Sequence, residues 1–189
     1  MSEVEYTPAP DFPFADALGR PGVSAIALDD DGNIPNNVLP LLVYQSAFDL
    51  DALRRESATL VQEIFRANNW VGSWVNGVFS YHHYHSTAHE VLGCFSGSAT
   101  VQFGGPSGVE VTVNTGDVIV IPAGVAHKNL GCSGDFGVVG AYPPGQQTDL
   151  LAGRACERPR ADENIARVPL PATDPVFGGD GPLLREWHG

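Results

Sequence analysis

The stretch 79–97, FSYHHYHSTAHEVLGCFSG, holds four of the six histidines of the chain within eight positions and follows them with a glutamate. Side chains along a strand alternate between its two faces, so His83 and His85 would point one way while His82 and Tyr84 point the other. Two imidazoles that are separated by one residue on a strand can bind a single metal ion. This stretch therefore predicts a strand that contributes two ligands to a metal site.

Two further donors stand where they can reach the same ion. Glu90 begins the next expected strand, after the turn STAH, and His127 follows the strand and turn DVIVIPAGVAH. Three neutral imidazole nitrogens and one carboxylate suit iron, manganese, nickel, cobalt or zinc, and they leave two adjacent positions open on an octahedral ion. A cation would also remove the cost of burying Glu90 without a partner. The predicted ligands of one divalent ion are therefore His83, His85, Glu90 and His127.

The same positions resemble the two sequence motifs of the cupin family. The first motif, G-x5-H-x-H-x4-E-x6-G, is matched by Gly77, His83, His85, Glu90 and Gly97. The second motif, G-x5-P-x-G-x2-H-x3-N, is matched by Gly116, Pro122, Gly124 and His127, with its final Asn displaced to Asn129. The phrases HHYHSTAHEVLG, GDVIVIPAGVAHKNLG and VPLPATDPVFG further resemble the small bacterial cupins of the YjlB-like group, over most of the chain past residue 30.

The resemblance implies an all-β fold, a single cupin jelly-roll barrel (double-stranded β-helix) with the metal ligands inside it. Cupins with this ligand set are often dioxygenases, so the resemblance implies dioxygenase-type chemistry on a small organic substrate before isomerase or decarboxylase chemistry. A non-catalytic protein that binds or senses a small ligand at the metal is the alternative.

The pattern of the remaining sequence agrees with a barrel. From residue 70, short apolar runs are separated by turn residues at intervals of about ten positions, which is typical of a sandwich or barrel. Asn76-Gly77 predicts a hairpin. Before this region, apolar residues at helical spacing predict one helix over about 50–68, with Asp49 as its N-cap and two asparagines at its end.

The chain of 189 residues is expected to form one domain. We divide it into an extended N-terminal arm (1–23), the barrel with its helix (24–142) and a Pro-rich C-terminal tail that wraps the barrel (143–189). The acidic run DDDGN at 29–33 is expected to be a solvated turn, because the spaced ligands of a calcium-binding loop are absent.

Four other side chains are expected near the ion. Phe79 and Tyr81 alternate in phase with the first ligand histidine and would form part of the pocket wall. Asn129 would face inward two positions after the last ligand histidine. Cys94 alternates in phase with the ligand glutamate, so it would line the cavity or, as we prefer, act only as a small buried apolar residue.

His89 competes for a ligand position, because H-x3-H is also a common metal-binding spacing. It directly precedes Glu90, however, and neighbours in an extended segment face apart, so we expect it behind the ligands or at the surface. By the same alternation His82 is expected outside the barrel. His188, next to the C-terminus, is expected to have no role.

Charge and composition narrow the possible partners. A net charge of −12, without a Lys/Arg cluster, would repel nucleic acid and anionic membranes. No apolar run is long enough for a membrane span and the N-terminus lacks the pattern of a signal peptide, so a cytoplasmic location is expected. Three cysteines without a close pair argue against a disulfide framework. The expected partners are a small-molecule substrate or ligand and a second copy of the chain in a homodimer.

Overall fold

The computed structural model describes residue 6 and residues 11–188, and its strands form two antiparallel sheets. The strands are β1 (Gly22–Leu28), β2 (Asn37–Gln45), β3 (Val71–Asn76), β4 (Glu90–Ser96), β5 (Ser98–Phe103), β6 (Val109–Asn114), β7 (Val118–Ile121), β8 (His127–Cys132) and β9 (Gly137–Tyr142). The helices are α1 (Leu50–Ala67), α2 (Arg160–Ile165), α3 (Pro182–His188) and a 3-10 turn at Ala15–Ala17. Over the described residues, no helix combines the length and apolar composition that crossing a membrane requires.

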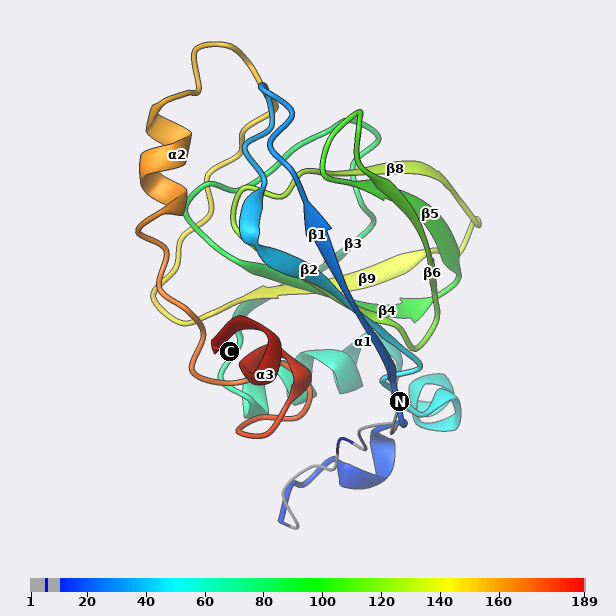
Figure 1. Cartoon of the computed structure of the whole chain (residues 1–189). Helices are drawn as coiled ribbons and strands as arrows, with labels where there is room; N and C mark the ends of the chain where they lie inside the picture. The colour runs from blue at the N-terminus through cyan, green and yellow to red at the C-terminus, as the bar shows by residue number, and fades with distance from the viewer. Residues whose placement is uncertain (1–5, 7–10, 189) are drawn as a thin grey trace.

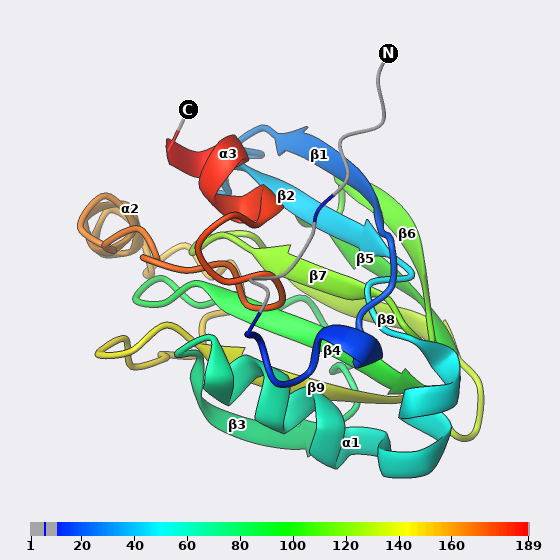
Figure 2. The same cartoon turned by 90° about the horizontal axis from the view of Figure 1, so that it is seen from below.

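The strand order brings together segments that are far apart in the sequence. The larger sheet has the order β1-β2-β7-β4-β9-β3, and the smaller sheet has the order β6-β5-β8. Figure 2 shows the six strands of the larger sheet in that order, with α1 and α3 lying across its outer face. In Figure 1 the smaller sheet lies on the other side of the larger sheet from α1. The prediction of an all-β fold is confirmed.

The inner strands β2, β7, β4 and β9 of the larger sheet are buried on both faces, which explains their uninterrupted apolar runs, whereas the edge strands β1 and β3 are largely exposed. Along β2, Leu41 and Val43 point between the two sheets, while Leu42 and Tyr44 point toward the helices, as the alternation of a strand requires. Each of these side chains is at most 3% exposed, and complete burial of such a Leu or Val contributes about 1.5–3 kcal/mol. One apolar core therefore lies between the sheets and a second lies under the helices.

Helix α1 begins and ends where the sequence predicts. Oδ1 of Asp49 accepts a hydrogen bond from the backbone N–H of Ala52 at 2.8 Å, which caps the first turn. Asn68 follows the last helical residue. Ser57, with φ 55° and ψ −136°, interrupts the helix and divides it in two. The buried face of α1 packs on β3, β4 and β9.

The hairpin predicted at Asn76-Gly77 is wrong. Strand β3 pairs with β9, with Val75 opposite Val139, and not with the segment that follows it. That segment leaves the sheet and approaches β8, where the carbonyl of Phe79 accepts a hydrogen bond from the backbone N–H of Asn129 at 2.9 Å. The local turn preference is overridden because β9, which comes from much later in the chain, offers β3 the edge of a larger sheet.

The tail after β9 has more regular structure than its Pro-rich composition predicts. It contains α2 and α3, and buried polar groups connect it to the sheet and to α1. Nε1 of Trp187 donates to the carbonyl of Pro40 at 3.0 Å, and Nδ2 of Asn68 donates to the carbonyl of Val176 at 2.8 Å. Of the expected N-terminal arm (1–23), residues 1–5 and 7–10 lie outside the described residues, and the remainder includes the 3-10 turn and the start of β1. The bounds proposed for arm, barrel and tail stay predictions.

Asp174 is the main polar contact between this tail and the sheet. Its side chain is fully buried. The carboxylate accepts hydrogen bonds from the hydroxyl of Tyr44 at 2.7 Å and from the backbone N–H groups of Val176, Phe177 and Leu183 at 2.8, 2.9 and 3.0 Å. Removing the carboxylate would leave these buried donors without an acceptor.

We expect Asp174→Ala to lower the free energy of unfolding by about 3 kcal/mol or more, because several buried N–H groups lose their partner. Urea unfolding followed by circular dichroism measures the change. The matched control is Tyr44→Phe, which removes a single donor and should cost about 1 kcal/mol. A loss for Asp174→Ala no larger than that of the control would contradict the assignment.

Candidate metal centre

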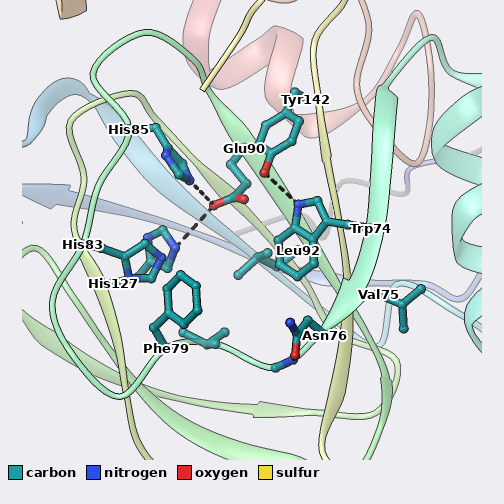
Figure 3. Close-up of a pocket in the computed structure, with 12 residues that line it drawn as sticks. Trp74, Val75, Asn76, Phe79, His83, His85, Glu90, Leu92, His127 and Tyr142 are labelled. Carbon is teal, nitrogen blue, oxygen red and sulfur yellow. Dashed lines mark hydrogen bonds and ion pairs between the residues drawn. The ribbon is translucent and has the colours of Figure 1, made fainter. Parts of the chain in front are cut away.

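Three histidine side chains from two segments meet inside the barrel. The backbones of His83 and His127 pair in both directions, with N···O distances of 3.2 and 2.9 Å, and their ring centroids lie 4.0 Å apart. The carbonyl of His85 accepts a hydrogen bond from the backbone N–H of Gly124 at 2.8 Å, which fixes the third histidine beside the turn before β8. One ring nitrogen of each histidine lies within 4.8 Å of those of the other two. The three rings are positioned to bind one metal ion (Figure 3).

The segment that carries His83 and His85 is not the regular strand that the sequence predicts. It forms isolated bridges, one at His83 and one at Tyr84. The side chains still alternate, since Tyr84 lies on the opposite face, where its hydroxyl donates to Oε2 of Glu157 at 3.1 Å. Two bridges in place of a continuous ladder are enough to keep both imidazoles on one side.

Glu90 brings a carboxylate to the same point. It is the first residue of β4, opposite Ile121 of β7, and is 2% exposed. Its Oε2 lies 3.3 Å from Nε2 of His127 and 3.6 Å from Nε2 of His85 (Figure 3). The four predicted residues are thus brought together by β4, β8 and the segment before β4.

The turn that delivers His127 depends on a glycine. Gly124 has φ +90°, a conformation that is strained for residues with a side chain. A Cβ there would lie 2.5 Å from the carbonyl oxygen of Asn36 and 2.6 Å from Cδ1 of Ile165. Only glycine therefore allows the chain to turn this tightly before His127 enters the barrel.

Backbone carbonyls determine which ring nitrogen of two histidines faces the centre. Nδ1 of His85 faces the carbonyl of Asp149, and Nδ1 of His83 lies 3.3 Å from the carbonyl of Tyr81. A carbonyl can only accept a hydrogen bond, so each Nδ1 carries the proton and each Nε2 of the neutral ring carries a lone pair. These lone pairs and the carboxylate of Glu90 are electron-rich groups directed at one point.

A divalent cation would stabilise this arrangement. Oε2 of Glu90 is buried and has no hydrogen-bond partner among the described residues, a state that costs several kcal/mol for an isolated carboxylate. Imidazole nitrogens and a carboxylate oxygen are donors that iron, manganese, nickel, cobalt and zinc all accept. The residues present therefore fit one ion of this group, and the donor types are common to all five metals.

Burial and charge set the protonation states of the four side chains. Burial lowers the pKa of His127 to about 3 and also lowers the pKa of His83, so both rings are neutral at pH 7. At His85 burial acts in the same direction, but the contact with the Glu90 carboxylate outweighs it and raises the pKa above 6.5. At Glu90 burial raises the pKa, while the neighbouring histidines lower it more, so its net pKa lies below the ordinary value.

The centre adjoins a cavity of about 240 Å³. On one side of it, Nε1 of Trp74 donates to the hydroxyl of Tyr142 at 2.7 Å, and that hydroxyl lies beside Glu90 (Figure 3). Gly140 makes room for this pair, because a Cβ there would lie 2.1 Å from the indole of Trp74. The lining residues are Trp74, Val75, Asn76, Gly77, Val78, Phe79, His83, His85, Glu90, Leu92, His127 and Tyr142.

Comparison with known proteins agrees with the motifs and the fold. Residues 73–135 match the family model described as "Cupin domain". The chain is also 45% identical to the "Uncharacterized protein YjlB" of Bacillus subtilis (strain 168) over 159 residues, which are 84% of this chain and 92% of the relative. This chain belongs to the cupin family. The predicted family is confirmed, and with it the jelly-roll, or double-stranded β-helix, fold.

Two solved structures are similar to this cupin at low identity. A Klebsiella pneumoniae protein with a double-stranded beta-helix domain is 15% identical, with a TM-score of 0.33, over 77% of this chain and 93% of its own. The dTDP-6-deoxy-D-glucose-3,5-epimerase RmlC from Legionella pneumophila is 16% identical, with a TM-score of 0.37, over 64% of this chain and 71% of its own. At these scores neither likeness carries an argument about the chemistry of this cupin.

Of the four additional side chains expected in the pocket, the cavity wall contains Phe79. Tyr81 and Asn129 are not among the lining residues. Cys94 is not among them either, in keeping with the preferred interpretation of it as a small buried apolar residue. The ring of Tyr81 stacks on the ring of Phe79, with centroids 5.1 Å apart. Cys94 is buried in the apolar core between the sheets, because β4 carries it about 13 Å beyond Glu90. Asn129 uses its Oδ1 to accept a hydrogen bond from a backbone N–H of its own strand.

His89 does not belong to the cluster of three histidines. It is buried against Trp187, with ring centroids 4.9 Å apart, and its Nδ1 accepts a hydrogen bond from the backbone N–H of Ala123 at 3.0 Å. Ala123 belongs to the turn that precedes His127. The ring of His89 therefore supports that turn from behind.

Sequence reasoning missed three polar residues of the cavity, which are Trp74, Asn76 and Tyr142. Trp74 and Tyr142 meet because β3 pairs with β9, and no pattern within either segment indicates that pairing. The sequence indicates Asn76 only as part of a turn with Gly77. A side chain at the end of an edge strand gives no indication of its own that it borders a cavity.

We expect His127→Gln to weaken the binding of a divalent ion by about a hundredfold or more, because it removes one of the three converging nitrogens. Competition with a coloured chelator measures the affinity for zinc, and mass spectrometry of the purified protein measures metal content. His188→Gln, an exposed residue of α3, is the control and should bind like the parent protein. Equal affinities for both variants would refute the centre.

Metal affinity should fall as the pH falls. At first a single proton, bound by one histidine, should compete with the metal ion. His83 and His127, whose pKa values are lowered, are already neutral near pH 7, whereas the raised pKa of His85 makes it the first ring to be protonated on acidification. Below the raised pKa of His85 we therefore expect a loss of metal affinity of about tenfold per pH unit. Zinc competition across this range measures the slope. If the zinc affinity fell about a thousandfold per pH unit already at pH 6, three protons would compete with the ion, which would contradict these protonation states.

Proposed function

We propose that this cupin is a small metal-dependent enzyme in which His83, His85, Glu90 and His127 hold one divalent ion. Dioxygenase-type oxidation of a small organic molecule is the chemistry we favour over isomerisation or decarboxylation at the same site. The observation that supports it is the convergence of the three histidines and a buried carboxylate beside a cavity large enough for a small molecule. A bound ion would polarise an oxygen of the substrate or, in the case of iron, exchange electrons with it.

The residues of the chain would prepare the site in three ways. Backbone carbonyls hold His83 and His85 with Nε2 directed at the centre. Val78 and Leu92 line the cavity with apolar surface that excludes water. The hydroxyl of Tyr142 accepts a hydrogen bond from the indole of Trp74, so its own proton is free to be donated toward Glu90 or toward a substrate oxygen.

A second candidate function is supported by the composition of the cavity. Apart from the four proposed ligands, Tyr142 is the titratable group among the described lining residues, and burial raises its pKa. A site with so few acids and bases also suits a protein that binds or senses a small ligand at the metal without converting it. For either function we further propose a cytoplasmic homodimer.

Iron-loaded protein supplied with a panel of small catechols, thiols and keto acids should consume dioxygen with at least one of them. An oxygen electrode measures the uptake, and His127→Gln should lose it because the ion is no longer held. Tight binding of panel members without oxygen uptake or product would instead support the binding protein. Failure to hold iron, manganese, nickel, cobalt or zinc would refute both functions.

A further inference from the structure

The cavity beside the three histidines has a largely apolar wall. Val75, Val78, Phe79 and Leu92 contribute to it, and none of the described residues that line the cavity is a lysine or an arginine. We propose that the substrate is compact and carries no charge beyond the group that reaches the metal centre, and that Asn76 donates a hydrogen bond to it. This inference rests on the proposed function and names its substrate class.

The volume of the cavity limits the size of the substrate. About 240 Å³ corresponds to on the order of eight waters at about 30 Å³ each. Pockets for drug-sized ligands enclose about 300–1,000 Å³. A single ring with one short substituent fits within these walls, whereas a nucleotide or a peptide would extend beyond them into solvent, past the exposed Val75 and Phe79.

The charges of the site limit the charge that the substrate can carry away from the metal. A carboxylate or phosphate remote from the metal would lose its water of hydration and meet no positive side chain among the lining residues. A bound divalent ion offsets the negative charge of Glu90, but the net charge of −12 on the chain repels anions at longer range. An uncharged substituent avoids both costs.

Asn76 is oriented to donate into the cavity. Its Oδ1 accepts a hydrogen bond from the backbone N–H of Gly77 at 2.8 Å, which fixes the carboxamide and occupies its oxygen. Figure 3 shows Nδ2 on the side of Leu92 and Trp74, inside the ring of lining residues. No described residue accepts a hydrogen bond from this Nδ2. Its two N–H groups are available for an acceptor on the substrate.

Phe79 provides a flat surface for the body of the substrate. Its ring lies edge-on to His83, with centroids 4.9 Å apart, and one face is stacked against Tyr81 at an interplanar angle of 11°. The stack holds the ring in place although Phe79 is 46% exposed. A planar, uncharged body beside this ring would gain from aromatic packing.

Calorimetric titration of zinc-loaded protein with kojic acid and with comenic acid tests the substrate class. The two probes share a hydroxypyranone group that binds metals through two oxygens, and they differ in a hydroxymethyl group against a carboxylate. The Kd of each probe for the protein is divided by the Kd of the same probe for free zinc in buffer. After this correction we expect kojic acid to bind at least about tenfold more tightly than comenic acid. Equal or reversed affinities, or no binding of kojic acid, would overturn the substrate class. If the protein still holds its zinc, the proposed function survives; loss of the zinc overturns both.

Asn76→Asp tests the hydrogen bond separately. The variant keeps an oxygen for the N–H of Gly77 and replaces the donor with an acceptor, so kojic acid should bind about three- to tenfold more weakly without a loss of zinc affinity. The matched control is Asn114→Asp, which adds the same charge to the last residue of β6, outside the cavity, and should leave the affinity for kojic acid unchanged. Unchanged binding in Asn76→Asp would overturn the role of Asn76.

Discussion

The arrangement of the barrel interior depends on one electrostatic constraint, which is the burial of the Glu90 carboxylate among imidazole rings that are mostly neutral. Carbonyls of the backbone hold the protons of His83 and His85 on Nδ1 and turn their Nε2 lone pairs toward the carboxylate. Contacts with the histidines stabilise the carboxylate in part, but its Oε2 has no hydrogen-bond partner among the described residues, and a divalent ion would give it a positively charged partner. The site is therefore built before the ion binds, and binding need not reorganise it.

Hydrogen-bonded strands hold the four proposed ligands in this arrangement. Glu90 is fixed in the middle of the larger sheet, where β4 pairs with both β7 and β9. His127 is fixed by β8, and its backbone in turn pairs with that of His83. Each ligand is thus part of a hydrogen-bonded framework instead of a free loop. Pre-organisation of this kind reduces the ordering that metal binding would otherwise require.

The apolar cores on the two sides of the larger sheet have different roles: one stabilises the fold, and the other borders the cavity. The core under α1 and α3 is closed by the C-terminal tail, whose carboxylate at Asp174 is satisfied by four donors. The core between the sheets ends at the cavity, which is lined by both polar and apolar side chains. Two buried carboxylates therefore differ in kind. Asp174 is completely hydrogen-bonded and stabilises the fold, while Glu90 keeps an oxygen without a partner.

The sequence by itself determined the family, the all-β fold, the bounds of α1 and the histidines that meet at the centre. It could do so because period-two alternation, an Asp N-cap and motif spacing are local, and each acts within a few residues. The tertiary structure decided that β3 pairs with β9, and hence that Trp74, Asn76 and Tyr142 border the cavity. It also places Tyr81 and Asn129 outside the wall of the cavity. The physical reason is that alternation along a strand fixes only the face on which a side chain lies. The distance of that side chain from the metal centre depends on its position along the strand and on which strand pairs beside it.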